Sequence, residues 1–212
     1  MQVTEIFHSI QGESTYAGLP CVFVRLTGCN LRCTWCDTEY SFYGGEKMTL
    51  DQVLEKVRSY GERLVEVTGG EPLLQKEVYP LMERLLGEGY RVLLETSGER
   101  SIAQVPREVV KIVDVKCPDS GAAGTFDPTN FDHLAPHDQV KFVLASRRDY
   151  EFARDFIRRH GLVGRVAAVI LSPVHGRMDL QELAAWILAD RLEVRFGYQL
   201  HKLIWGAEAR GV

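Results

Sequence analysis

The sequence predicts an α/β fold, a partial (β/α) barrel of about six mainly parallel strands with a reduced set of helices. Apolar segments alternate along the chain with helical patterns, and most of these segments are nearly continuous rather than alternating. Continuous apolar runs are typical of strands that are buried on both faces. A doubly wound open sheet is the alternative, because it shows the same alternation. The length suits a single domain over residues 1–212.

The expected strands are apolar runs bounded by polar or glycine-bearing turns. They lie at Cys21–Thr27, Arg63–Thr68, Arg91–Thr96, Val109–Val115, Gln139–Leu144, Arg165–Leu171 and Glu193–Leu200. The first residues, Met1–His8, also have a strand-like pattern.

Helical patterns fill several of the intervals. They cover Leu50–Tyr60, Lys76–Leu86, Arg148–His160 and Leu180–Leu188. Thr49 and Gln52 have the spacing of a capping box for the first of these helices, and Asp179 precedes the last. The stretch Asp119–Asp138 is long and rich in Gly, Pro, Asp and Asn, so we expect either a lid or a mobile surface loop there.

The overall charge and hydropathy exclude two classes of partner. The formal net charge is −4, whereas a protein that binds nucleic acid normally carries a basic excess. No apolar run approaches the roughly 18 residues of a membrane span, and Met1–His8 lack the apolar core of a signal peptide. We therefore expect a cytoplasmic protein that binds neither nucleic acid nor a membrane.

Three of the five cysteines, Cys29, Cys33 and Cys36, lie within eight residues, directly after the strand that Gly28 ends. In α/β folds such a loop lies at the sheet edge where ligands bind. A closed zinc site or a fully ligated cluster would need a fourth ligand, which Cys117 could supply, whereas Cys21 resembles a small core residue. We favour a 4Fe–4S cluster with one open iron; a zinc site completed by a distant His or Cys is the alternative.

The triplet, with Trp35 before its last cysteine, resembles the Cx3CxΦC signature of the radical S-adenosylmethionine (SAM) superfamily. The segment Gly69–Pro72 resembles the GGEP segment that holds the amino group of SAM in that superfamily. The resemblance implies that SAM chelates the open iron. One electron from the cluster then splits SAM into methionine and a 5′-deoxyadenosyl radical, which abstracts a hydrogen from the substrate.

Further segments narrow the resemblance to one family. The N-terminal segment Glu5–Ser14, the segment Cys29–Thr38, the TGGEP sequence and the terminal Gln199–Lys202 with Trp205 resemble 7-carboxy-7-deazaguanine synthases. That family converts 6-carboxy-5,6,7,8-tetrahydropterin to 7-carboxy-7-deazaguanine with loss of ammonia, on the route to queuosine and other 7-deazapurines. The resemblance implies SAM, the cluster and Mg²⁺ as cofactors, a reduced radical SAM barrel, a homodimer, and a flavodoxin or ferredoxin as reductant.

The resemblance also implies roles for individual residues. Substrate contacts fall on Ile10, Gln11, Gly12, Glu13, Arg25, Thr68 and His201, and the Mg²⁺ ligand is Thr38. SAM contacts fall on Trp35, Cys36, Asp37, Gly70, Glu95, Ser97, Asp114, Val115, Lys116, Ser172, Pro173, Val174 and His175. No protein acid or base is assigned.

Arg25 also stands out from its own position, between Val24 and Leu26 in an apolar strand. A buried guanidinium without a partner is costly, so a bidentate anion such as the substrate carboxylate would resolve that cost. An internal Glu as partner is the alternative.

Two other functions stay open from the sequence. A glycyl-radical activase shares the triplet and GGEP, but acts on a protein backbone and has no need of Arg25. A non-catalytic module that binds zinc or a cluster is the other alternative.

Overall fold

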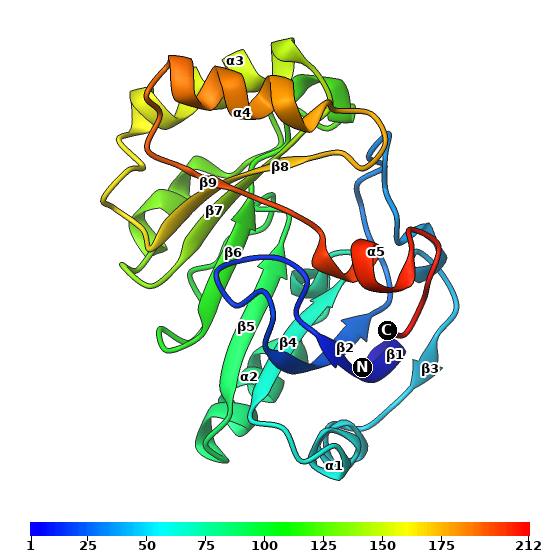
Figure 1. The fold of residues 1–212 in the computed structure, drawn as a ribbon. Coiled ribbons are helices and arrows are strands. Elements are labelled where there is room, and N and C mark those ends of the chain that lie inside the picture. Colours follow the sequence, from blue (N-terminus) through cyan, green and yellow to red (C-terminus); the bar gives the residue numbers. More distant parts are fainter.

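The computed structural model describes all 212 residues, and a single nine-stranded sheet organises them (Figure 1). The strand order is β3-β1-β2-β4-β5-β6-β7-β8-β9, with β3 and β9 at the open edges. Strands β2 and β4 to β9 run parallel to one another, whereas β1 is antiparallel to both β2 and β3.

The strands are β1 (Gln2–Ile10), β2 (Pro20–Leu26), β3 (Glu46–Lys47), β4 (Leu64–Gly69), β5 (Arg91–Thr96), β6 (Val110–Asp114), β7 (Gln139–Leu144), β8 (Ala168–Pro173) and β9 (Arg195–Phe196). The helices are α1 (Leu50–Ser59), α2 (Val78–Gly87), α3 (Arg147–His160), α4 (Leu180–Ala189) and α5 (Leu200–Trp205). No α-helix connects β5 to β6, and only two 3-10 turns, Pro118–Ser120 and Pro128–His133, connect β6 to β7. The helix set is therefore reduced, as predicted.

The outer face of the sheet carries the larger part of the core. Val22, Val24 and Leu26 of β2 pack in one cluster with side chains of α1 and α2. Phe142 of β7 packs with Tyr150 of α3 in a second cluster. Since side chains alternate along a strand, the residues between these positions point to the inner face, which α1 to α4 leave uncovered. This arrangement confirms a partial barrel rather than a sheet covered by helices on both faces.

Most element boundaries agree with the sequence predictions. The Thr49–Gln52 capping box forms in both directions, and the Asp179 side chain caps α4. The strand predicted at Arg165–Leu171 begins and ends later in the chain, as β8. Gly161 and Gly164, both with positive φ, belong to the turn that precedes it.

The predicted strand Glu193–Leu200 was too long. Only Arg195–Phe196 pairs with β8, and Leu200 instead begins α5, where its N–H donates to the carbonyl of Gly12 at 2.9 Å. Neither β3 nor α5 was predicted.

The stretch 119–138 is held by specific contacts rather than free. The backbone carbonyl of Ser120 accepts from Thr34 N at 2.9 Å, which ties this stretch to the cysteine loop. The buried Asn130 side chain donates to Gly98 O at 2.9 Å and accepts from Ile102 N at 2.9 Å. Separately, none of the helices is both long and apolar enough to span a membrane.

Candidate functional site

The inner face of the sheet carries polar and charged side chains in the middle and at the carboxyl ends of its strands. They are Arg25 on β2, Glu66 and Thr68 on β4, Glu95 on β5, Asp114 on β6 and Lys141 on β7. Below them the same face is apolar, with Cys21, Phe23, Leu64, Leu93, Val110 and Ile112 in one small cluster. The polar side chains therefore surround a cavity of about 320 Å³, and the apolar cluster forms its floor.

Most of the predicted site residues line this one cavity. They are Ile10, Gln11, Gly12, Glu13, Arg25, Cys29, Cys33, Trp35, Cys36, Asp37, Thr38, Thr68, Gly70, Glu95, Ser97, Asp114, Lys116, Val174, His175 and His201. Three predicted SAM contacts do not line it: Val115 points into the outer core, Ser172 is buried in β8, and Pro173 lies at a smaller neighbouring cavity.

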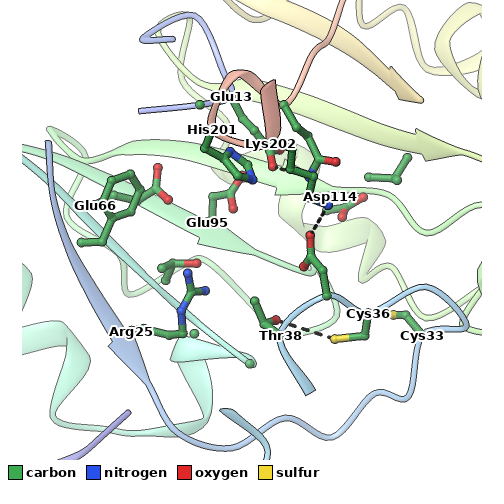
Figure 2. Close-up of a pocket in the computed structure, with 18 of the residues that line it drawn as sticks. Glu13, Arg25, Cys33, Cys36, Thr38, Glu66, Glu95, Asp114, His201 and Lys202 are labelled. Atoms are coloured by element: carbon green, nitrogen blue, oxygen red, sulfur yellow. Dashed lines mark hydrogen bonds and ion pairs between the residues drawn. The ribbon is translucent and has the colours of Figure 1, made fainter. Parts of the chain in front are cut away.

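The three cysteines of the loop after β2 are free thiols that line the cavity. Figure 2 shows two of them, Cys33 and Cys36. Cys36 N donates to Cys33 O at 3.2 Å, and Cys36 Sγ lies 3.7 Å from Thr38 Oγ1. Burial raises the pKa of the Cys33 thiol, while the nearby Lys116 lowers it.

The other two cysteines, Cys21 and Cys117, are buried in the core and do not line the cavity. Cys117, the possible fourth ligand, is therefore not available at the cavity. No three His, Cys, Asp or Glu side chains converge on the position of one metal ion. A closed zinc site needs four such ligands, and Cys117, the possible fourth, is fully buried outside the cavity.

Residues at the ends of β4 and β6 fit a cluster and a bound SAM. Gly70 lies so close to the cysteine loop that a Cβ there would come within 2.6 Å of the Cys29 Cβ, so only glycine lets the two loops meet. Asp114 accepts from Lys116 Nζ at 2.7 Å through Oδ2, but its buried Oδ1 has no partner. A buried acceptor without a donor is costly, and a donor on a ligand in the cavity would remove that cost.

The glutamate of the GGEP segment does not line the cavity. Glu71 is buried and accepts from Thr96 Oγ1 at 2.9 Å and from both N and Oγ of Ser97 at 2.7 Å. It therefore fixes the end of β5, and Ser97, a predicted SAM contact, lines the cavity while its hydroxyl donates to Glu71.

Arg25 is not the unpaired guanidinium that we predicted. Its Nε donates to Glu5 Oε1 at 2.7 Å, and the same oxygen accepts from the Tyr40 hydroxyl at 2.7 Å, so the alternative of an internal Glu partner is correct for this nitrogen. Its two terminal nitrogens make no hydrogen bond, and Arg25 lines the cavity. Glu5 and Tyr40 thus hold one side of a guanidinium whose bidentate side stays free.

The turn at Gln11–Glu13 is held by the last helix. Gln199 Nε2 donates to Glu13 Oε1 at 3.0 Å, and the His201 ring packs so closely on Gly12 that a Cβ at position 12 would collide with it. Burial lowers the pKa of His201, although Glu13 opposes that shift, so the imidazole is neutral at pH 7.

Two charged residues of the cavity were missed by the sequence analysis, Glu66 and Lys141. Glu66 accepts from Gln11 Nε2, and burial together with Glu95 raises its pKa well above the usual range. Lys141 Nζ lies 2.6 Å from Glu95 Oε1 and 3.0 Å from Glu13 Oε2. Burial disfavours the charge of Lys141, but these carboxylates raise its pKa. Both residues are charged and lie within otherwise apolar strands, which is the same sequence pattern that singled out Arg25.

We expect Glu66→Gln to stabilise the protein at alkaline pH. The pKa of Glu66 is higher in the folded state than in the unfolded state. Between these two pKa values the folded protein keeps a proton on Glu66 that the unfolded protein has lost. The free energy of unfolding therefore falls as the pH rises from the lower value to the higher one. Glutamine has no proton to lose, so its advantage grows with pH, to on the order of 1 kcal/mol or more at about pH 8. Thermal melts of both proteins between about pH 5 and pH 8 measure this difference. A difference that stays constant with pH would contradict the assignment.

Helix α5 and the C-terminal tail 206–212 close one side of the cavity. Lys202 Nζ donates to Asp37 Oδ2 at 2.7 Å, which ties α5 to the cysteine loop. The Arg210 guanidinium lies 4.4 Å from the centre of the Tyr40 ring, and the residues 207–212 all line the cavity. The tail therefore covers the side on which Glu5 and Tyr40 hold Arg25.

Comparisons with known proteins agree with this architecture. Residues 23–116 match the radical SAM superfamily. The 7-carboxy-7-deazaguanine synthase of Koribacter versatilis is 56% identical over 226 residues and is covered in full, as is this chain. The protein of that name from Chlorobaculum tepidum is 44% identical over an alignment of 216 residues that covers 100% of this chain and 97% of the relative. The crystal structure of QueE from Escherichia coli superimposes with a TM-score of 0.77 over 94% of both chains, at 23% identity, which supports the fold.

Proposed function

The chain belongs to the 7-carboxy-7-deazaguanine synthase family of the radical SAM superfamily. On this basis, we propose the reaction that takes place in its cavity. The reaction is the conversion of 6-carboxy-5,6,7,8-tetrahydropterin to 7-carboxy-7-deazaguanine with loss of ammonia, in the biosynthesis of queuosine and other 7-deazapurines.

One observation carries the proposal. A single cavity is lined by three free thiols on the loop after β2 and by Arg25, whose two terminal nitrogens have no partner in the protein. The first feature suits a redox cluster, and the second suits a planar anion such as a carboxylate. A glycyl-radical activase would require the first feature but not the second.

The cluster would be held by Cys29, Cys33 and Cys36, and SAM by Gly70, Asp114 and the neighbouring loop residues. When bound, the two supply radical hydrogen abstraction. The protein contributes position and exclusion of water: α5, the tail and the apolar floor around Phe23 enclose the cavity, and enclosure protects a radical from side reactions.

Substrate recognition falls to the remaining lining residues. Arg25 would bind the substrate carboxylate, and Gln11, Glu13 and Thr68 would accept or donate hydrogen bonds to the heterocycle. His201, neutral at pH 7, packs on Gly12 and keeps this turn in place.

We assign Mg²⁺ to Thr38, whose side chain lines the cavity. The Thr38 hydroxyl has one contact in the protein, with Cys36 Sγ at 3.7 Å, and a metal ion would replace that contact. One hydroxyl suits Mg²⁺, which keeps several waters and substrate oxygens as its other ligands. We expect Thr38→Ala to raise the Mg²⁺ concentration needed for half-maximal turnover by about tenfold or more, without loss of cluster. Titration of activity with Mg²⁺ measures this, with Thr38→Ser as control because it keeps the hydroxyl. An unchanged requirement in Thr38→Ala would contradict the assignment.

Membership of the family supports two proposals about partners. We propose a flavodoxin or ferredoxin as reductant and a homodimer as the working form. Sedimentation of the protein at micromolar concentration tests the second proposal, which a monomer would contradict.

Reductive SAM cleavage tests the function against its alternatives. The protein, loaded anaerobically with iron and sulfide and supplied with SAM, Mg²⁺ and reductant, is expected to form 5′-deoxyadenosine faster with the carboxy-tetrahydropterin than without it. A glycine-containing peptide should give no such increase. Zinc at one per chain without iron or sulfide would indicate the non-catalytic module instead.

A further inference from the structure

Two lysines are buried in the parallel sheet, and they have different surroundings. Lys111 of β6 lies 3.0 Å from Asp138, outside the cavity, and both side chains are almost fully buried. This ion pair has no contact with the cavity and has a structural role. Lys141 of β7 points instead to the inner face, where it lines the cavity between two carboxylates.

The two carboxylates come from opposite parts of the fold. Glu13 follows β1 and reaches Lys141 through Oε2, while its Oε1 accepts from Gln199 of the segment before α5. Glu95, at the end of β5, uses Oε1 for Lys141, and its Oε2 has no partner. A long, flexible side chain without such contacts would be free to rotate, so Lys141 fixes the positions of both carboxylates at the cavity.

Other charged groups surround this centre. They are Glu66 on β4, Asp114 on β6, Lys116 after β6, Arg25 on β2 and His201 on α5. Although burial raises the pKa of Glu13, Lys141, Gln199 and His201 outweigh it and hold that pKa at about 2. Glu13 is thus ionised at working pH despite its burial, and Lys141 is the largest of the groups that keep it so.

We propose that Lys141 is a positioning residue, which holds the Glu13 and Glu95 carboxylates as a pair of fixed acceptors for the donor-bearing edge of the substrate heterocycle. The inference rests on the proposed function, since a tetrahydropterin carries an amino group and ring N–H donors along one edge and its carboxylate elsewhere. Arg25 lies apart from Glu13 and Glu95 along the cavity (Figure 2). Anion-binding and donor-binding groups at separate places fix the orientation of such a ligand.

Binding of the stable analogue 6-carboxypterin tests the proposal without any cofactor. We expect Lys141→Met to weaken binding by about 30-fold or more at pH 7, and Lys141→Arg, which keeps the charge, by about fivefold or less. Without Lys141, burial raises the pKa of Glu13, so the affinity of Lys141→Met should fall further from about pH 8 to pH 6 while the wild type stays level. Lys111→Met is the matched control: it removes the other buried lysine, and its binding and pH profile should equal those of the wild type.

Each outcome decides the question. Binding by Lys141→Met within about threefold of the wild type, or a loss in Lys141→Arg as large as in Lys141→Met, would overturn the proposal. If Lys141→Met does not fold, Lys141→Gln, which keeps hydrogen bonds without the charge, should bind about tenfold more weakly, and unchanged binding would again overturn it. A wild type that neither binds 6-carboxypterin nor turns over the carboxy-tetrahydropterin would instead refute the proposed function, independently of Lys141.

Discussion

Replacing Cys33 by alanine is expected to abolish turnover. With Cys33 gone, the loop after β2 retains two thiols, and the two remaining cysteines of the chain are fully buried in the core and cannot substitute for it. A 4Fe–4S cluster held by two thiolates has two irons without protein ligands, so we expect it to be lost during reconstitution. Iron and sulfide content, absorbance of the reconstituted protein and 5′-deoxyadenosine formation measure the loss, which should exceed about 1,000-fold in turnover.

Cys117→Ala is the matched control for this experiment. Its thiol is fully buried in the outer core and lies 3.8 Å from the Val115 carbonyl, so the change should cost about 1 kcal/mol of stability and leave the cluster intact. Loss of the cluster in Cys117→Ala would show that Cys117 is a fourth ligand. A stable, active cluster in Cys33→Ala would contradict the assignment of the triplet.

The second large effect is expected from Arg25→Ala. The two terminal nitrogens of Arg25 are free to bind a carboxylate in a bidentate manner, and loss of a charge-assisted pair of this kind weakens binding by about 2–4 kcal/mol, or 30- to 1,000-fold. The variant should lose affinity for 6-carboxypterin but bind pterin, which lacks the carboxylate, as the wild type does. Cluster content and SAM cleavage without substrate should remain.

Arg25→Lys and Glu5→Gln refine this test. Lysine keeps the charge without the planar fork, so it should recover only part of the affinity. Glu5→Gln keeps an acceptor for Arg25 Nε but removes the charge, so its effect should be smaller than that of Arg25→Ala. An equal loss of affinity for pterin and 6-carboxypterin in Arg25→Ala would show that Arg25 supports the cavity rather than the carboxylate.

The sequence predicted the outer half of the fold well, because it is determined by local patterns. The capping box at Thr49 and Gln52 and the Asp179 cap set helix starts within one residue. The strands β5 and β7 were predicted to the residue, since their apolar runs end sharply at polar turns.

The inner face was predicted only in part. Arg25 was recognised as a charge in an apolar strand, but the same reasoning was not applied to Glu66 and Lys141, which occupy equivalent inward positions on β4 and β7. The three residues are brought together only by the order of the strands in the sheet, which hydrophobic patterns do not specify.

The C-terminal part was beyond local reasoning. Helix α5 has no buried residue, so it shows no amphipathic pattern facing a core. Its position is set by contacts between distant parts of the chain: Gln199 with Glu13 across 186 residues and Lys202 with Asp37 across 165 residues. Such contacts follow from the closed fold and have no signature within a short window.

Formation of the product from the proposed substrate tests the central claim most directly. The reconstituted protein is incubated anaerobically with 6-carboxy-5,6,7,8-tetrahydropterin, SAM, Mg²⁺ and reductant, and the products are quantified by mass spectrometry and an ammonia assay. We expect 7-carboxy-7-deazaguanine and ammonia in equal amounts, with neither formed by Cys33→Ala. SAM cleavage that proceeds in the wild type with neither product would contradict the account.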